Sequence, residues 1–210
     1  MKTAIINASP KIKNSNCALV LNDFKCYLGD KCELIECKLS FNTDYNEVFD
    51  TIKQADAWVF AFPLYVDNMP SHLLKFLEWL NDSKPDISNK HVYAITNCGF
   101  YEGIQAKCAI NIVHYWCDKT GNIYGGSVGV GGGEAFDALK SVPVGYGPKA
   151  SIDKALENLS NAVLNQTTTD DRFENLNYPR FLYKLGATGR WKKLIRKNGG
   201  KVKDLGRKLS

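Results

Sequence analysis

The chain of 210 residues lacks long apolar runs and the patterns typical of secreted proteins. No stretch of about 18 or more apolar residues is present, so no segment is predicted to span a bilayer, and no apolar segment near the N-terminus resembles a signal peptide. Seven cysteines, an odd number without repeating spacing, argue against a framework of secreted disulfides. We therefore expect a cytoplasmic protein whose cysteines are mostly reduced.

The sequence also lacks metal-binding motifs. The histidines His72, His91 and His114 are scattered, and none stands at ligand spacing from a cysteine or carboxylate, so each is expected to be a surface or helix residue. The spacing of Cys26, Cys32 and Cys37 is too irregular for an iron–sulfur cluster. No metal site is therefore predicted.

Charge is distributed unevenly along the chain. Residues 172–210 hold 12 Lys/Arg and 2 Asp/Glu, a net of +10, whereas residues 1–171 hold 15 Lys/Arg and 20 Asp/Glu, a net of −5. Between them lies the polar segment NQTTTDD, residues 165–171, which has no apolar periodicity. We predict a domain over residues 1–165 and a basic extension over residues 166–210.

Apolar segments alternate with helical patterns along the first domain. The predicted strands are residues 3–6, 32–37, 57–62, 90–97 and 124–130, and the predicted helices are residues 16–28, 47–54, 70–80, 104–119 and 151–163, with Ser151 as a helix cap and Pro70 in a first turn. Ala57–Phe62 is continuously apolar, as in a strand covered on both faces. The alternation predicts an α/β fold, an open parallel sheet with helices on both faces.

The strand order follows from two missing glycine motifs. Residues 7–17, NASPKIKNSNC, contain no glycine, so the GxGxxG loop of the dinucleotide-binding order is absent, and the pattern GxxxxGK[ST] is absent too. The remaining order is the flavodoxin-like doubly wound five-stranded sheet, 2-1-3-4-5. Its ligand site lies at the carboxyl ends of strands 1 and 3.

Three loops at this edge carry candidate binding residues. Ser9–Cys17 precedes a helix, where Ser9, Ser15, Asn16 and either Lys11 or Lys13 suit a phosphate monoester; a helix cap after a solvated loop explains the same residues equally well. Residues 63–69 and 97–103 add Tyr65, Phe100 and Tyr101, which suit the faces of a flat heteroaromatic ring, although any one aromatic alone is explained by local packing.

The segments ASPKIKNSN, FPLYVDNMPSHLLKFLEW and TNCGFYEG resemble those of the flavodoxin-like NAD(P)H-dependent FMN reductase and quinone reductase family, over about residues 1–165. The resemblance implies that the first loop binds the FMN phosphate and that the other two surround the ribityl chain and the isoalloxazine ring. The implied cofactor-binding residues are Ser9, Lys11, Ser15, Asn16 and Cys17, then Pro63, Leu64, Tyr65, Val66, Asp67, Asn68 and Met69, then Asn97, Cys98, Gly99, Phe100, Tyr101 and Glu102. Cys17 departs from the Ser or Thr usual in relatives, and because a thiol is a weak donor its contact is expected through the backbone.

The resemblance implies an FMN-dependent NAD(P)H oxidoreductase, in which hydride passes from nicotinamide to flavin and electrons then pass to a flavin, quinone or other small acceptor. It also implies a homodimer. The alternative is an electron carrier that serves protein partners without using NAD(P)H. Because the cofactor supplies the chemistry, no catalytic residue is nominated. Cys98 is interpreted as structural, with a reactive thiol as the alternative.

Two further segments remain open. Residues 131–134, GGGE, suit contact with a substrate or a second subunit, or form a plain glycine-rich turn. The extension predicts two short basic amphipathic helices, interrupted at residues 186–189, that suit a membrane surface, an acidic protein partner, or docking on the acidic domain of the same or a neighbouring subunit. Nucleic acid is not expected, because the aromatic residues do not form a stacking platform.

Overall fold

The computed structural model describes residues 1–11, 15–83 and 87–206 of the chain. It divides into two compact units, Met1–Asn177 and Tyr178–Ser210. The first unit extends beyond the predicted domain end at residue 165, because residues 172–177 pack with the sheet.

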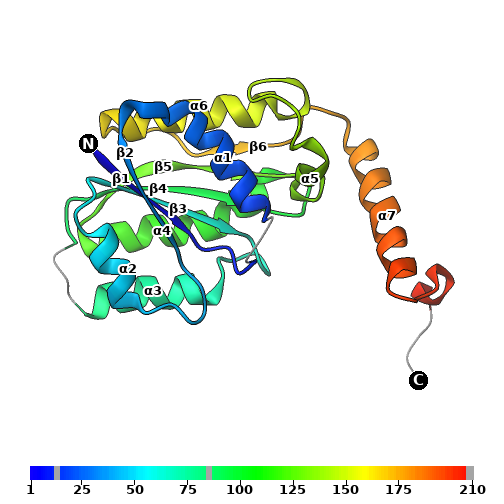
Figure 1. Ribbon diagram of the computed structural model, residues 1–210, viewed down its shortest axis with the longest axis horizontal. Helices are drawn as coiled ribbons and strands as arrows, with labels where there is room; N and C mark the ends of the chain where they lie inside the picture. The colour runs from blue at the N-terminus through cyan, green and yellow to red at the C-terminus, as the bar shows by residue number, and fades with distance from the viewer. Residues whose placement is uncertain (12–14, 84–86, 207–210) are drawn as a thin grey trace. The chain divides into compact units, whose positions relative to one another are not determined.

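The first unit is built on a parallel sheet with the order β2-β1-β3-β4-β5-β6 (Figure 1). The strands are β1 (Lys2–Asn7), β2 (Glu33–Lys38), β3 (Ala57–Pro63), β4 (His91–Asn97), β5 (Ile123–Val130) and β6 (Arg172–Glu174). The flavodoxin-like order predicted for five strands is confirmed, and β6 extends the sheet beyond β5. Sequence reasoning missed β6 because it has three residues and lies in the polar, charged segment after the last helix.

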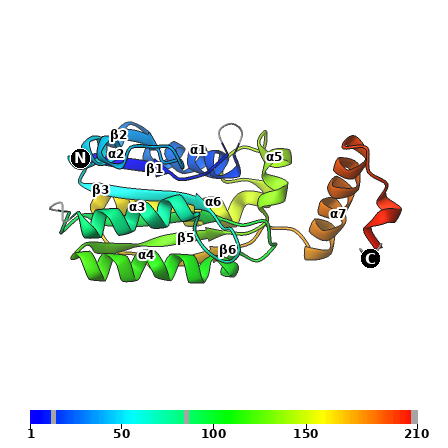
Figure 2. The same cartoon turned by 90° about the horizontal axis from the view of Figure 1, so that it is seen from below.

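Helices cover both faces of the sheet, as predicted (Figure 1). The helices of the first unit are α1 (Asn16–Leu28), α2 (Tyr45–Ile52), α3 (Ser71–Asp82), α4 (Lys107–Thr120), α5 (Phe136–Leu139) and α6 (Ala150–Asn165). Helices α1 and α6 pack together on one face. Helices α2, α3 and α4 lie side by side on the other (Figure 2).

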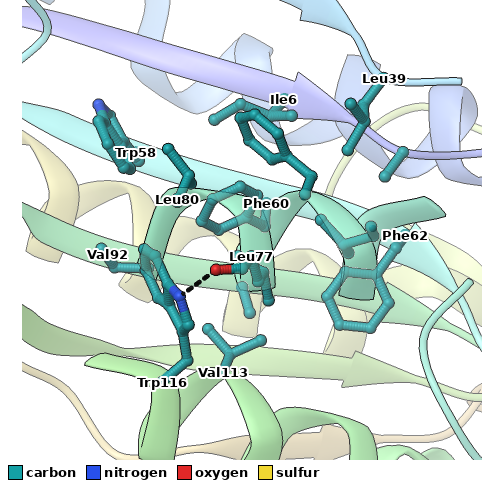
Figure 3. Packing of buried hydrophobic residues seen from close by; sticks show 14 of the residues in the cluster. Ile6, Leu39, Trp58, Phe60, Phe62, Leu77, Leu80, Val92, Val113 and Trp116 are labelled. Carbon is teal, nitrogen blue, oxygen red and sulfur yellow. Dashed lines mark hydrogen bonds between the residues drawn. The ribbon is translucent and has the colours of Figure 1, made fainter. Parts of the chain in front are cut away.

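The core explains why β3 is a continuous apolar run. Trp58, Phe60 and Phe62 on β3 are fully buried against α2, α3 and α4 (Figure 3). The two indole N–H groups in this core are satisfied: Trp58 Nε1 donates to the Ile52 carbonyl at 3.0 Å, and Trp116 Nε1 donates to the Leu77 carbonyl at 2.9 Å. The sheet thus packs against apolar helix faces, and both indole N–H groups in this part of the core are paired.

Helix starts differ from expectation at two positions. Ser151 does not cap α6; it lies inside the helix, and its hydroxyl donates to the Asn175 carbonyl at 2.9 Å. Pro70 is the N-cap residue of α3 rather than part of its first turn, because its backbone is extended, with ψ of 140°. Each helix therefore begins within one or two residues of the predicted position, with a different residue at its cap.

In the second unit, residues 178–206 are described and form one long helix, α7 (Arg180–Lys197), followed by a short 3-10 turn, Val202–Gly206. The prediction of two helices was therefore wrong. Gly186 and Gly189 lie within α7, since an interior glycine costs a helix only about 1 kcal/mol relative to alanine. Among the residues that the structure describes, no helix is both long and apolar enough to cross a bilayer.

Candidate functional site

The three predicted loops meet at the carboxyl edge of the sheet. The strand register aligns Pro63 with Asn97 and Asn97 with Val130, so β3, β4 and β5 end at a common level; Asn7 at the end of β1 aligns with Ala61, two residues before the end of β3. The second and third loops are joined directly, because Leu64 N donates to the Asn97 carbonyl at 2.8 Å. The second and third loops are therefore neighbours at this edge.

The loop after β5 joins the first and third loops. The Asn16 side-chain amide donates to the Gly133 carbonyl at 2.7 Å, and Gly133 N donates to the Cys98 carbonyl at 2.8 Å. A Cβ at Gly133 would lie 2.6 Å from the Cys98 oxygen, so a side chain at this position requires the loops to move. The segment 131–134 is therefore a close-packed junction of the site. Sequence reasoning left its role open because glycine carries no chemical signal of its own.

The first loop places its polar groups at the start of α1. Ser15 is the N-cap residue, and its hydroxyl accepts from Ala18 N at 3.1 Å; Ser9 is buried, and its hydroxyl lies 3.4 Å from Lys11 N. Lys11 is exposed, and Lys13 lies outside the described residues. Ser15 therefore caps the helix, as one of the two explanations for this loop predicts. The phosphate site at this helix start stays a prediction.

The two cysteines near the site have buried thiols. Burial raises the pKa of Cys17 to about 12 and is the main reason that the pKa of Cys98 is raised to about 11. The Cys98 thiol points to the carbonyls of Phe100 and Glu102, at 3.7 and 3.5 Å. Both thiols stay protonated at neutral pH, so the geometry favours the structural interpretation of Cys98 and leaves the Cys17 side chain in the core.

The second loop contains a strained turn. Tyr65 and Asn68 exchange backbone hydrogen bonds of 2.8 and 3.0 Å, and the two residues between them have positive φ, 48° at Val66 and 59° at Asp67. A β-branched residue at positive φ is a backbone outlier, and such strain concentrates at functional sites. Val66 is 98% exposed, and Tyr65 beside it is also exposed. The turn therefore presents apolar side chains to solvent at the edge where a ligand is predicted.

Residues 172–177 form hydrogen bonds with the third loop. Gly103 N donates to Asn175 Oδ1 at 2.8 Å, and the Tyr101 hydroxyl donates to the Leu176 carbonyl at 3.1 Å. Tyr101 is thus anchored by its hydroxyl to this segment, whereas Phe100 is exposed. The segment, assigned from sequence to the extension, belongs to the support of the site.

A cavity of about 380 Å³ lies beside the first two loops, lined by Pro10, Phe41, Tyr65, Met69, Pro70 and Ser71. Sequence reasoning missed Phe41, which follows β2. Because β2 is parallel to β1, the loop after β2 also ends at the carboxyl edge, and an aromatic residue in it could have been included on the same grounds as Tyr65 and Phe100.

His72 holds this side of the site together. Its Nε2 donates to the Ala8 carbonyl at 3.0 Å, and its ring centre lies 4.5 Å from that of Phe41. Burial lowers the pKa of His72, so the ring is neutral at pH 7. His72 is therefore a buried residue of α3 rather than a surface residue. His91 begins β4, and His114 lies on α4.

The groups at this edge fit FMN. Hydroxyls, a lysine and helix N–H groups gather at the first loop, which suits a phosphate, and the neighbouring loops offer exposed aromatic and aliphatic side chains, which suit a flat ring. In the described part of the chain, no three His, Cys, Asp or Glu side chains gather as a metal site would require.

Residues 22–120 match the family model described as NADPH-dependent FMN reductase. The match includes the second and third loops, whereas the first loop precedes it. No curated protein matches the chain.

Solved structures share the fold at low sequence identity. An FMN-dependent NADH-azoreductase from Bacillus anthracis str. Ames Ancestor, solved in complex with FMN, is 16% identical with a TM-score of 0.53, and the alignment covers 79% of this chain and 100% of that one. An NADPH-quinone reductase from P. pentosaceus is 17% identical with a TM-score of 0.54, covering 80% and 99%. A flavodoxin from Streptococcus pneumonia TIGR4 is 14% identical with a TM-score of 0.55, covering 80% and 100%. Residues 22–120 are thus similar to the NADPH-dependent FMN reductases, in agreement with the resemblance of the second and third loops, and the solved structures show a flavodoxin-like fold.

Proposed function

We propose that the protein is an FMN-dependent NAD(P)H oxidoreductase that reduces a flavin, a quinone or another small acceptor. The observation that carries this proposal is that hydrogen bonds join the three predicted loops at one sheet edge. Asn16, Gly133 and Cys98 connect the first loop with the third, and the Leu64–Asn97 bond connects the second with the third. The match of residues 22–120 to the reductase family supports the same activity.

When bound, FMN supplies hydride and electron transfer. The chain's own residues bind and orient it. Ser9, Lys11 and the α1 N-terminus would hold the phosphate, whose negative charge the helix dipole favours. Tyr65 and Phe100 would cover the ring and exclude water, leaving an open side for a nicotinamide. No side chain acts as a nucleophile, in keeping with the protonated thiol of Cys98.

The proposal is tested by titrating the purified chain with FMN and then adding NADPH or NADH without oxygen. We expect a bound flavin spectrum, bleaching by at least one nicotinamide, and reoxidation when a flavin or quinone is added. A chain that takes up no FMN contradicts the proposal. The pair of nicotinamides measures the preference between NADPH and NADH.

Gly133→Ala tests the junction itself. The added Cβ would meet the Cys98 carbonyl at 2.6 Å, so the variant should bind FMN more weakly by about tenfold, the effect of 1.4 kcal/mol. Gly186→Ala is the control, since a Cβ there meets nothing within 4 Å. Equal FMN affinity in both variants would show that the junction does not shape the site.

The second candidate function is an electron carrier for protein partners. The observation that favours it is the likeness to a flavodoxin, whose TM-score of 0.55 is close to the 0.54 of the quinone reductase and the 0.53 of the azoreductase. The fold alone therefore does not separate a carrier from a reductase. A carrier would bind FMN yet stay oxidised when mixed with NADPH or NADH in the absence of oxygen.

We further propose a homodimer in the cytoplasm. Phe41, Tyr65, Val66 and Phe100 are all exposed around the site in the single chain, and a second copy would cover them. All seven cysteines are free thiols, which suits a reducing compartment. Sedimentation velocity of the FMN-loaded protein tests the dimer; a monomeric mass at micromolar concentration argues against it.

A further inference from the structure

The second unit exposes an apolar surface that its own fold does not cover. We call it the tail face: Trp191 and Leu194 on α7, and Leu205 on the 3-10 turn, which are 64%, 44% and 67% exposed. A cavity of about 320 Å³ lies within the unit, lined by Tyr183, Lys184, Ala187, Thr188, Trp191, Lys192 and Leu205. Large exposed apolar groups that gather around a hollow mark a contact surface rather than a folding core.

The charge around the tail face has one sign. Residues 178–210 hold 11 Lys/Arg and a single acidic residue, Asp204, a net of +10. Between Arg190 and Lys203, 7 of 14 residues are basic and none is acidic. A net positive charge of this size attracts an anionic surface.

The basic and apolar residues of α7 lie on opposite sides of its second half. At 100° per residue, Ala187, Trp191, Leu194 and Ile195 share one side, and Lys193, Arg196 and Lys197 share the other. Lys184 and Lys192 are among the residues that line the cavity. Such side chains place their stems along an apolar layer and their ammonium groups in water.

This arrangement favours a lipid surface over other anionic partners. A helix with Trp and Leu on one side and several Lys/Arg on the other suits the boundary between headgroups and acyl chains. Four to eight basic residues on such a helix are typical of binding to anionic lipids. A nucleic-acid site would need a row of stacking aromatics, and in the described part of α7 beyond Gly189 Trp191 is the one aromatic.

The helix itself gains from such a surface. Gly186 and Gly189 weaken α7 by roughly 1 kcal/mol each relative to alanine, and a Cβ at either position would meet nothing within 4 Å. A helix of this composition depends on packing of its apolar side for stability. A bilayer surface supplies that packing.

We propose that the second unit binds the surface of an anionic lipid bilayer, with Trp191, Leu194 and Leu205 entering the boundary between headgroups and acyl chains. Lys192, Lys193, Arg196 and Lys197 contact the anionic headgroups. The inference does not rest on the proposed flavin chemistry.

The experiment uses the full chain with vesicles of phosphatidylcholine alone or with roughly a third phosphatidylglycerol. Trp191 is a native reporter, because Trp58 and Trp116 are buried and Trp79 is half-buried. We expect cosedimentation with the anionic vesicles, at least about tenfold tighter than with the neutral ones, a blue shift of the exposed tryptophan, and release by salt.

Two double variants with the same change of net charge locate the contact. Lys192→Glu/Lys193→Glu should weaken vesicle binding by more than about tenfold, because each basic residue near the surface contributes about 1 kcal/mol. Lys31→Glu/Lys75→Glu, exposed on the first unit, should change it less than about twofold. Trp191→Ser should remove the blue shift and weaken binding while leaving the salt dependence.

Three outcomes overturn the proposal. The first is equal binding to neutral and anionic vesicles, or no binding to either. The second is an equal loss in both double variants, which would assign the effect to net charge alone. The third is tighter binding to a second copy of the chain or to RNA than to vesicles, with Lys192→Glu/Lys193→Glu abolishing that association.

Discussion

Helices α6 and α7 are similar in length, but they differ in the burial of their apolar side chains. In α6, 16 residues long, Ile152, Leu156 and Leu159 are almost completely buried. In α7, 18 residues long, only Tyr183 is buried among the described residues, and Phe181 and Trp191 are more than 60% exposed. Apolar residues at helical spacing therefore stabilise the fold in one region and form an open surface in the other.

The charges follow the same division. Residues 1–177 hold 16 Lys/Arg and 21 Asp/Glu, a net of −5, against the +10 of residues 178–210. Within the acidic unit a lysine can be buried, because Lys149 pairs with Asp23 at 2.7 Å. Apolar residues at helical spacing therefore do not by themselves distinguish a core helix from a surface helix. In this chain the two helices also differ in the net charge of the region in which they lie.

The clearest difference in stability is expected between two phenylalanines. Phe60→Ala removes a fully buried ring from β3 and should lower the free energy of unfolding by roughly 3–5 kcal/mol. Phe181→Ala, on the exposed side of α7, should change it by less than about 0.5 kcal/mol. Denaturant unfolding measures both, and a similar loss in the two variants would mean that α7 is packed against the fold.

The buried ion pair gives the next effect in size. Lys149→Met leaves the Asp23 carboxylate without its partner in a nearly buried position, and we expect a loss of roughly 3 kcal/mol. Lys154→Met breaks the exposed pair with Glu157, of similar length at 2.8 Å, and should cost less than about 1 kcal/mol. Chemical denaturation of the two variants compares a buried with an exposed contact of the same chemistry, and equal losses would contradict the distinction.

A smaller effect depends on pH. The pKa of His72 is lowered from its ordinary value of 6.5 in the folded state, because burial disfavours the charged ring. The unfolded chain therefore binds the proton first, so the contribution of His72 to stability is present above pH 6.5 and is lost as pH falls through its folded pKa. Between about pH 7.5 and 5.5, the melting temperature of His72→Gln should fall less with decreasing pH than that of the unchanged chain. An equal fall in both proteins would assign the pH dependence to other groups.

The least change is expected in α7. Gly186→Ala and Gly189→Ala should each stabilise the helix by about 0.5–1 kcal/mol, because glycine is less favourable than alanine in a helix interior. Slower amide hydrogen exchange across α7, without a change in the first unit, is the expected readout. Faster exchange would show that the glycines meet a close neighbour in solution.

Much of the fold was predictable because its signals are local. The continuous apolar run of β3, the helical spacing of α3 and α4, and the absence of glycine after β1 together indicated the strand order. The predicted cap at Ser151 was wrong because its hydroxyl bonds to Asn175, a contact that spans 24 residues. Strand β6 was missed because three residues in a polar segment carry no periodicity.

Some residues of the candidate site carry a local sequence signal, whereas others depend on long-range contacts. Tyr65 and Phe100 could be proposed from sequence because aromatic residues after parallel strands carry a signal. Phe41 follows β2 at the same edge and lines a cavity with Tyr65. Gly133 and His72 act through contacts with Cys98, Asn16 and Ala8 that lie far away in sequence.

Local patterns were sufficient to predict the α/β architecture, the three-loop edge and the division into an acidic and a basic region, because periodicity, loop composition and charge are properties of neighbouring residues. The folded chain was needed to show that the loops are joined through Gly133, that Cys98 is buried and protonated, and that α7 is one helix with exposed apolar residues. Burial and long-range hydrogen bonds depend on which surfaces meet after folding, and no local pattern contains that information.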